Sequence, residues 1–340
     1  MTRYNTLTAF VIGLGSMGKR RVRNLRALGV ERILGTDLRD DRRREAVERY
    51  GIEAVPSVER GLAQHPDLVI ISTPPHRHLE FAYAAIQAGL PFFMEANCFS
   101  EGMAGLIDAL RGKSLVAAPS RTLWFNEGVR RVKELLDAGS LGTPAEFMHH
   151  CGHALPQWHP WEDYRSFYGG QPEAKGAGWD MVAFESHLFT HWFGDVKSVS
   201  ALYGKRTTFN TPVDDTFQII LEFRAGTLGS AMIDVISPYA FRTTRIVSEK
   251  GVIAFDDIKK TVDLFTAGSI DWTHYRHEPG HVEPGYVASE EMYIQEIEAF
   301  LKAVLGLAPY VATFEDELKL MRIVDAVRES KETGRLINLQ

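Results

Sequence analysis

The sequence predicts an α/β fold in two parts: a domain with a parallel sheet covered by helices on both faces, then an α/β domain with a large, mostly antiparallel sheet. Short apolar runs alternate with helical stretches over residues 1–122, which is the pattern of a parallel sheet. A glycine-rich turn joins the first apolar run to the first helix. After residue 123 the apolar runs lengthen, alternate with polar residues and are separated by turn signals, as in antiparallel hairpins.

The first domain is predicted to span residues 1–122. Gly29, Gly51 and Gly89 stand where helix C-terminal caps are expected, because glycine tolerates the left-handed conformation of such caps. The predicted strands are Leu7–Ile12, Arg32–Thr36, Leu68–Ser72, Pro91–Met94 and Ser114–Ala118. The predicted helices are Met17–Leu28, Arg42–Tyr50, Val58–Ala63, His78–Ala88 and Ser100–Leu110.

The second domain is predicted to span residues 123–340 and to bind substrate and form oligomers. It begins with a helix at Asn126–Ala138. The predicted strands are Ala145–His153, Val196–Gly204, Phe217–Phe223, Leu228–Val235, Thr243–Ser248 and Val252–Phe255. The helices Ser289–Leu305 and Glu315–Thr333 close the chain, and we expect them to pack back toward the first domain.

The composition excludes several classes of protein. With 340 residues, 45% of them hydrophobic and 24% charged, the chain is long enough for about two folded domains. A net charge of -6 argues against an extended nucleic-acid surface. No apolar run approaches the roughly 18 residues of a membrane span, and the N-terminal residues lack the pattern of a secretory signal. We therefore expect a cytoplasmic protein with a small-molecule partner, no nucleic acid and no membrane.

The strongest motif is Gly13-Leu14-Gly15-Ser16-Met17-Gly18, which follows an apolar strand directly and opens a helix. Gly13 permits the tight turn, Gly15 lets the backbone approach a pyrophosphate, and Gly18 lets helix and strand pack closely. The helix N-terminus offers the amides of Ser16 and Met17 and the positive end of its dipole to the phosphates. The motif therefore predicts a dinucleotide site.

Asp37 and Arg39 bear on which dinucleotide binds. Asp37 ends the second predicted strand, where an acid binds the adenosine ribose hydroxyls, and its charge repels a 2'-phosphate. This favours NAD, but Arg39 is able to hold a 2'-phosphate and leaves NADP open. The arginines of the first helix are interpreted as a solvated face rather than a phosphate clamp. These are Arg20, Arg21, Arg23 and Arg26.

Several segments carry a family resemblance. The glycine motif, Ser72-Thr73-Pro74-Pro75-His76 and Glu95 resemble the glucose-fructose oxidoreductase, inositol dehydrogenase and rhizopine catabolism (Gfo/Idh/MocA) family. Phe125-Asn126 and the segments 176–194 and 315–339 are also similar to that family, so the resemblance covers nearly the whole chain. It implies an N-terminal Rossmann domain, a C-terminal α/β domain with a mostly antiparallel sheet, and a homodimer or homotetramer formed through the open sheet face.

The resemblance assigns further cofactor contacts to Ser72, Thr73, Pro74, His76 and Glu95, the last near the nicotinamide ribose. It fails at the next residue, because the family usually reads Glu-Lys-Pro where this chain reads Glu95-Ala96-Asn97. The lysine normally hydrogen-bonds the reacting hydroxyl, and Ala96 lacks any group for that role. Asn97 is retained as a candidate contact that positions an oxygen without supplying charge.

The family also usually carries an Asp-x-x-x-His pattern on the helix over the nicotinamide. In this chain Asp180 stands near the acid position and Phe184 near the imidazole. Asp180, Phe184, His187 and His191 nevertheless share one helical stripe, with Asp180 and His187 about 10 Å apart along the axis. His187 is the first candidate for general base because its ordinary pKa lies near neutrality, with a buried core histidine as the alternative.

Aromatic and polar residues alternate in the segment 158–165, which suits carbohydrate binding because an aromatic face packs on a sugar ring. The segment resembles a stretch in family members associated with surface-polysaccharide and nonulosonic-acid sugar synthesis; a subunit contact is the alternative. Trp158, Arg165, Arg121 and His153 are candidate substrate contacts, and Tyr164 is a candidate proton donor. His149, Cys151 and His153 alternate along one strand, but no acid completes a metal site, so we expect no metal.

These observations predict an NAD-dependent oxidoreductase that transfers hydride between nicotinamide and a secondary alcohol or ketone of a sugar, inositol or nucleotide sugar. A role in surface-polysaccharide sugar synthesis follows from the resemblance of the aromatic segment. Two alternatives stay open because of Ala96: an enzyme that retains NAD and uses transient oxidation for epimerisation, elimination or glycoside cleavage, and a noncatalytic NAD- or sugar-binding regulatory protein.

Overall fold

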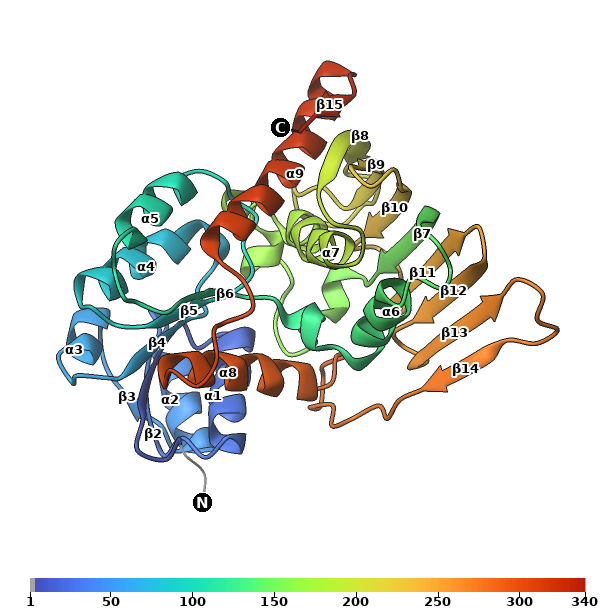
Figure 1. The fold of residues 1–340 in the computed structure, drawn as a ribbon. Coiled ribbons are helices and arrows are strands. Elements are labelled where there is room, and N and C mark those ends of the chain that lie inside the picture. The colour runs from blue at the N-terminus through green and yellow to red at the C-terminus, as the bar shows by residue number, and fades with distance from the viewer. Residues whose placement is uncertain (1–3, 340) are drawn as a thin grey trace. The chain divides into compact units, whose positions relative to one another are not determined.

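The computed structural model describes residues 4–339 and divides the chain into two compact units (Figure 1). The first contains Met1–Thr122 and Glu290–Leu318, and the second contains Leu123–Ser289 and Lys319–Gln340. The boundary after residue 122 coincides with the predicted one. Residues 290–318 were assigned to the second domain but expected to pack back toward the first, and apolar side chains of this segment complete the core of the first unit.

The first unit is built on a six-stranded sheet in the order β3-β2-β1-β4-β5-β6, in which all neighbouring strands are parallel. The strands are β1 (Thr8–Ile12), β2 (Arg32–Thr36), β3 (Glu53–Ala54), β4 (Leu68–Ile71), β5 (Phe92–Met94) and β6 (Ala117–Pro119). The helices are α1 (Ser16–Ala27), α2 (Asp40–Tyr50), α3 (Val58–Leu62), α4 (His78–Gln87), α5 (Met103–Leu110) and α8 (Glu291–Val304). This confirms the predicted Rossmann domain; only the short strand β3 has no counterpart in the prediction.

The two faces of this sheet are covered by different helices because the strands alternate their side chains. Ala9 and Val11 of β1 pack into a core with residues of α1, α2 and α8, while Phe10 and Ile12 pack with residues of α3, α4 and α5. Phe300 of α8 lies 5.9 Å from Phe93 of β5, ring centre to ring centre. Burial on both faces explains why the strands read as continuous apolar runs.

The second unit is built on a nine-stranded sheet in the order β14-β13-β12-β11-β7-β10-β9-β8-β15. Only β7 and β10 pair in parallel; the other neighbours are antiparallel. The strands are β7 (Pro144–Gly152), β8 (Val196–Gly204), β9 (Thr216–Phe223), β10 (Leu228–Asp234), β11 (Phe241–Ser248), β12 (Gly251–Asp256), β13 (Thr261–Thr266), β14 (Thr273–Arg276) and β15 (Ile337–Asn338). The predicted hairpins β9–β10 and β11–β12 are present, whereas the outer strands β13, β14 and β15 were not predicted.

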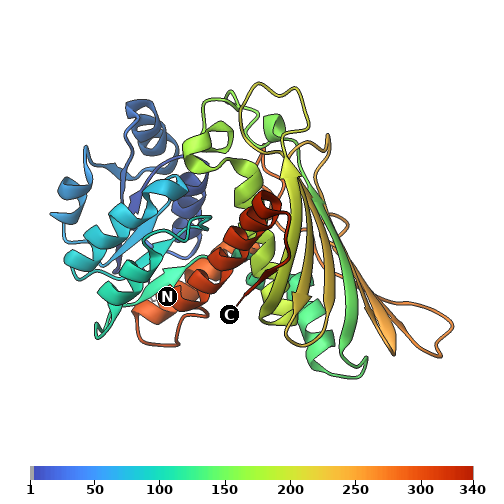
Figure 2. The same cartoon turned by 90° about the horizontal axis from the view of Figure 1, so that it is seen from above.

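Helices of the second unit lie along one face of its sheet (Figure 2). They are α6 (Glu127–Asp137), α7 (Ala177–Phe193) and the part of α9 (Phe314–Thr333) that follows residue 318. Phe147 of β7 stacks on Phe193 of α7, with ring centres 4.5 Å apart, and Gly229 leaves room for the Phe147 ring. This aromatic packing fixes α7 on the sheet.

The other face of the sheet exposes a patch of apolar side chains. Met148, Leu202, Ile220 and Leu228 are 62%, 69%, 53% and 55% exposed. They come from four neighbouring strands, and the strand register places them on one face. Within residues 4–339, none of the helices combines the length and hydropathy that crossing a bilayer requires.

Candidate functional site

The turn between β1 and α1 has the geometry of a dinucleotide-binding loop. Gly13 adopts φ +92°, and a Cβ there would lie 2.5 Å from the Ser72 carbonyl oxygen. A Cβ on Gly18 would lie 1.8 Å from the Gly13 carbonyl oxygen, so helix and strand pack too closely for a larger residue. Both glycines therefore do what the motif predicts.

Gly15 differs from these two because it borders open space. A Cβ there would meet only the end of the Arg42 side chain, at 3.3 Å. The first turn of α1, which includes Ser16 and Met17, contains no acidic residue, so its amides and the helix dipole favour an anion. The loop thus fits the pyrophosphate of a dinucleotide.

Asp37 follows β2 and is held against the loop. Its Oδ2 accepts a hydrogen bond from the Leu14 amide at 2.8 Å, and its Oδ1 accepts one from the Arg39 amide at 2.9 Å. The Arg39 guanidinium pairs instead with Asp41, with Nε 3.0 Å from Oδ1. The arginine beside the Asp37 carboxylate is Arg42, at 3.8 Å, which sequence reasoning missed. Arg42, which lies in the first turn of α2, is therefore near the glycine loop, whereas Arg39 pairs with Asp41.

The loop after β4 supplies Ser72, Thr73 and Pro74, and His76 lies in the short 3-10 helix that follows. His78 Nε2 lies 2.8 Å from the Thr73 carbonyl oxygen. Burial lowers the pKa of His78 to about 4, so the imidazole is neutral near pH 7 and holds the loop without adding charge.

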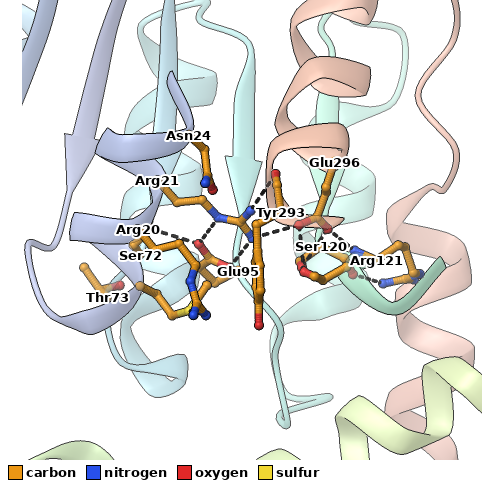
Figure 3. A network of polar contacts seen from close by, with 12 residues as sticks. Arg20, Arg21, Asn24, Ser72, Thr73, Glu95, Ser120, Arg121, Tyr293 and Glu296 are labelled. Carbon is orange, nitrogen blue, oxygen red and sulfur yellow. Dashed lines mark hydrogen bonds and ion pairs between the residues drawn. The ribbon is translucent and has the colours of Figure 1, made fainter. Parts of the chain in front are cut away.

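Glu95 follows β5 and is fixed by a buried arginine (Figure 3). Arg21 of α1 donates from Nε and Nη2 to the two carboxylate oxygens of Glu95, at 2.6 and 2.8 Å. The same Nη2 lies 2.8 Å from Glu296 of α8, and the Ser72 hydroxyl donates to Glu95 at 3.1 Å. Burial opposes the charge of Arg21, but the two carboxylates raise its pKa above the usual value.

The interpretation of the α1 arginines as a solvated face is therefore wrong for Arg20 and Arg21, which are both buried. Arg20 Nε lies 2.9 Å from Glu290, and Arg21 Nη2 lies 2.8 Å from Glu296. The partners come from a segment far along the chain, so local sequence around α1 contains no sign of them.

The residues after Glu95 do not replace the missing lysine. Ala96 carries no polar group, and Asn97 is engaged locally: its Nδ2 donates to the Phe99 carbonyl at 2.5 Å, and its Oδ1 accepts the Phe99 amide at 3.2 Å. Asn97 is also buried, and its predicted contact with cofactor or substrate stays a prediction. Cys98 is buried too.

The expectation that Arg121 contacts substrate is corrected. The side chain is fully buried in the first unit, where its Nη1 donates to the Ser120 carbonyl at 2.7 Å and pairs with Glu317. Its charge is balanced inside the protein, and the residue does not present a positive group to a substrate.

In the second unit, α7 carries Asp180, Phe184 and His187. The Tyr168 hydroxyl donates to Asp180 Oδ2 at 3.0 Å, and both residues are partly buried. Phe184 is also partly exposed, whereas His187 is fully buried, with 0% of its surface exposed. The stripe predicted from helical spacing is thus partly exposed at Asp180 and Phe184 and buried at His187. Tyr168, which the sequence did not single out, joins the candidates.

The aromatic segment is tied down by local contacts. Trp158 Nε1 donates to the His153 carbonyl at 2.9 Å, and their rings stack with centres 6.3 Å apart. The Tyr164 hydroxyl accepts the Asn210 amide at 3.1 Å. The exposed Arg165 pairs with Asp163, with Nε 2.9 Å from Oδ1. Burial lowers the pKa of His153, because it disfavours the charged imidazolium.

The structure adds an acid to the histidine and cysteine of β7. His149, Cys151 and Glu185 are all buried, and their ligand-type atoms lie within 4.8 Å of one another. Sequence reasoning saw no such acid because Glu185 comes from α7. Arg242, however, places Nη2 at 2.8 Å from Glu185, and a cation in that position opposes a metal ion. The absence of a metal stays a prediction.

The fold and the glycine loop define the first unit as an NAD-binding Rossmann domain of an oxidoreductase. A family model described as "Oxidoreductase family, NAD-binding Rossmann fold" matches residues 7–96, and one described as "GFO/IDH/MocA C-terminal domain" matches residues 129–254. The chain belongs to the GFO/IDH/MocA oxidoreductase family, which confirms the resemblance found in the sequence.

Curated relatives cover most of the chain. Inositol 2-dehydrogenase 3 of Saccharopolyspora erythraea is 28% identical over 78% of this chain and 77% of the relative. Myo-inositol 2-dehydrogenase of Thermotoga maritima is 23% identical over 97% of this chain and 98% of the relative.

Solved structures show the same fold. Levoglucosan dehydrogenase in complex with NADH has a TM-score of 0.85 at 20% identity and covers 98% of this chain and 99% of that chain. GenD2 from gentamicin A biosynthesis, in complex with NAD, has a TM-score of 0.82 at 18% identity over 98% and 96% of the two chains.

Proposed function

We propose that the protein transfers hydride between NAD and a secondary alcohol or ketone of a sugar, an inositol or a nucleotide sugar. The observation that carries the proposal is the arrangement of the cofactor site. The glycine loop follows β1, and Asp37 and Glu95 follow β2 and β5, which lie on either side of β1 in the sheet. NAD, when bound, supplies the hydride acceptor. The names of the relatives, inositol and levoglucosan dehydrogenases, support a polyhydroxylated substrate.

For the proton of the reacting hydroxyl, Asp180 with Tyr168 is the favoured pair. Both side chains are partly buried and already share a hydrogen bond, so a proton at the Tyr168 hydroxyl has an acceptor in place. His187 remains the alternative base proposed from the sequence; its burial favours a supporting role in α7.

The segment 158–165 is proposed to take the sugar ring. Trp158 supplies an aromatic face, and Tyr164 and Arg165 supply polar groups, although both are held by neighbours. The proposed role in surface-polysaccharide sugar synthesis rests on this segment alone.

The test is a screen of inositols, free sugars and nucleotide sugars that follows the absorbance of reduced nicotinamide. Asp180→Asn and Tyr168→Phe are expected to lower kcat at least about tenfold with NAD affinity unchanged. His187→Ala tests the role of His187 as base separately from the Asp180–Tyr168 pair. No turnover by the wild type on any compound, with NAD binding intact, contradicts the proposal.

A second candidate is a noncatalytic protein that binds NAD or a sugar and regulates a partner. Ala96 and Phe184 favour it, since a methyl group and a phenyl ring stand where the family usually has lysine and histidine. A primary deuterium isotope effect on any substrate excludes this candidate. Tight NAD that survives purification with no net redox change favours the NAD-retaining enzyme instead.

We also propose that the protein forms a homodimer or homotetramer through the open sheet face. The exposed side chains of Met148, Leu202, Ile220 and Leu228 lie on four neighbouring strands, and an apolar patch of this kind is typical of a subunit interface.

A further inference from the structure

Trp161 belongs to an aromatic pair that the proposed sugar contacts leave out. Its ring lies 5.2 Å from the ring of Tyr286, centre to centre, at an angle of 45°. Trp161 is nevertheless 46% exposed, and Tyr286 is partly exposed. The Trp161–Tyr286 pair therefore presents aromatic surface to solvent while its two rings support each other.

A tight turn fixes the position of Tyr286. The segment 283–286 reads Glu-Pro-Gly-Tyr, and the Tyr286 amide donates to the Glu283 carbonyl at 3.0 Å. Gly285 has φ +84°, and a proline before such a residue is the signature of a type II turn. A Cβ on Gly285 would lie 2.8 Å from Trp161 Cζ3, so the glycine also lets the turn approach the indole ring. The turn thus presets the place of Tyr286 beside Trp161.

A row of ring contacts connects this pair to the residues proposed to move the proton. The Trp161 ring stacks on His159 with centres 5.1 Å apart, and the His159 ring lies 4.4 Å from that of Phe167. Phe167 is 4% exposed and lies 5.8 Å from Tyr168, whose hydroxyl donates to Asp180. The row therefore begins at the Asp180–Tyr168 pair, passes through the core and ends at an exposed ring.

The carboxylates beside the Trp161–Tyr286 pair indicate the charge of a ligand. Glu162 follows Trp161 in the chain and places Oε1 3.0 Å from His159 Nδ1, and Glu283, which opens the turn, places Oε2 3.5 Å from His281 Nε2. The exposed arginine of the segment 158–165 is already paired, as described above. Carboxylates accept hydrogen bonds from sugar hydroxyls but repel phosphate groups. These surroundings suit an uncharged sugar better than a nucleoside diphosphate.

We propose that Trp161 and Tyr286 form a platform for an uncharged sugar ring, and that the substrate is a glycoside or oligosaccharide. An aromatic face packs on the C–H groups of a sugar ring, while the hydroxyl groups at the edge of the ring reach neighbouring polar groups. The inference rests on the proposed function, because Trp158 then takes the sugar that reacts and the platform takes the sugar linked to it.

Calorimetric titration of the NAD-loaded protein with maltose, cellobiose, glucose and UDP-glucose tests the platform without requiring turnover. The wild type is expected to bind one of the two disaccharides more tightly than glucose or UDP-glucose. Trp161→Ala and Tyr286→Ala are each expected to raise the Kd for that disaccharide about tenfold, because a stacking ring is lost. Trp161→Phe and Tyr286→Phe keep an aromatic face and should stay within about threefold of the wild type.

Trp272→Ala is the matched control. Trp272 is also partly exposed, and its ring lies 5.5 Å from that of Phe265 at an angle of 50°, which is a similar pair at another place in the second unit. Its disaccharide Kd is expected to equal that of the wild type. If Trp161→Ala fails to fold, Tyr286→Ala decides the question, since it removes a side chain from a surface turn.

The outcomes separate the platform from the proposed function. A wild type that binds neither disaccharide, or alanine variants with an unchanged Kd, overturns the platform, while hydride transfer from single sugars would leave the proposed function standing. A Trp161→Ala protein that binds the disaccharide normally but changes its mass in light scattering also overturns it and assigns the pair to a subunit contact. Disaccharide binding that depends on both rings, with no hydride transfer from any sugar, keeps the platform and contradicts the proposed function.

Discussion

Arg242 of β11 and Glu185 of α7 form a salt bridge in the second unit, with Nη2 2.8 Å from Oε1 and the Glu185 side chain fully buried. Arg242 Nη1 also lies 2.8 Å from Asp257. The guanidinium thereby joins the helix to the sheet and balances two carboxylates that a dry interior would otherwise penalise.

Replacing Arg242 with Met is expected to destabilise the protein by about 3–5 kcal/mol, because it leaves the buried Glu185 without its cation, whereas Asp257 keeps Lys260. The free energy of unfolding in urea measures the effect. Arg245→Met, on the same strand but exposed, serves as the control and is expected to change stability by less than about 0.5 kcal/mol. Equal losses of unfolding free energy in Arg242→Met and Arg245→Met would show that the buried salt bridge does not stabilise the protein more than an exposed arginine does.

The same pair predicts how stability depends on pH. Burial disfavours the charged form of Glu185, but Arg242 and His149 outweigh it and lower its pKa to about 2. A carboxylate with a lowered pKa contributes stability above its unfolded value of about 4.3, and that stability is lost as the pH falls toward 2. Urea unfolding between pH 7 and pH 3 should show this decline, with a smaller slope in Arg242→Met. If the stability of the wild type and of Arg242→Met fell equally with pH, the pH dependence would not come from the Glu185–Arg242 pair.

Gly18 and Gly15 are expected to respond differently to alanine. Gly18→Ala places a Cβ 1.8 Å from the Gly13 carbonyl oxygen and should destabilise the protein by at least about 2 kcal/mol. Gly15→Ala meets only the Arg42 side chain, so its stability should stay near that of the wild type while NAD affinity falls about tenfold. Thermal unfolding and calorimetric NAD titration distinguish the two. Loss of stability in Gly15→Ala would show that this glycine is needed for packing.

Asp37 is expected to determine the choice of dinucleotide. Asp37→Ser removes the charge that repels a 2'-phosphate and leaves Arg42 beside the loop, so NAD affinity should fall about tenfold and the preference for NAD over NADP should narrow. Titrations with both dinucleotides measure the ratio. Asp41→Asn, which releases Arg39, should leave the ratio unchanged. If Asp41→Asn changed the ratio of NAD to NADP affinity by the same factor, Arg39 would be the residue that selects the dinucleotide.

The open sheet face predicts a change in oligomeric state. Ile220→Glu puts a charge among the exposed apolar side chains of that face and should shift the protein toward a monomer in light scattering after gel filtration. Ile270→Glu introduces the same charge at a residue that is 95% exposed outside the sheet, and it should have no effect. A wild type that is already monomeric refutes the proposed interface.

Local pattern was enough for most of the parallel sheet and for the cofactor loop of the first unit. Apolar strands, glycine caps and Gly13-Leu14-Gly15-Ser16-Met17-Gly18 each depend on neighbours within one strand or one turn, so the sheet and the cofactor loop were predictable. The outer strands of the second sheet were not predicted. β14 reads Thr-His-Tyr-Arg and β15 has two residues, so neither carries an apolar signal.

What the sequence by itself determined is therefore the fold class, the family and the NAD loop. Only the tertiary structure decided the partners of the charged side chains. In the folded chain, Arg21 pairs with Glu95 and Glu296. Arg121 pairs with Glu317, and Arg242 pairs with Glu185. The physical reason is that a buried charge must find its counter-charge in space, and the acids that satisfy these arginines lie on elements remote in the chain.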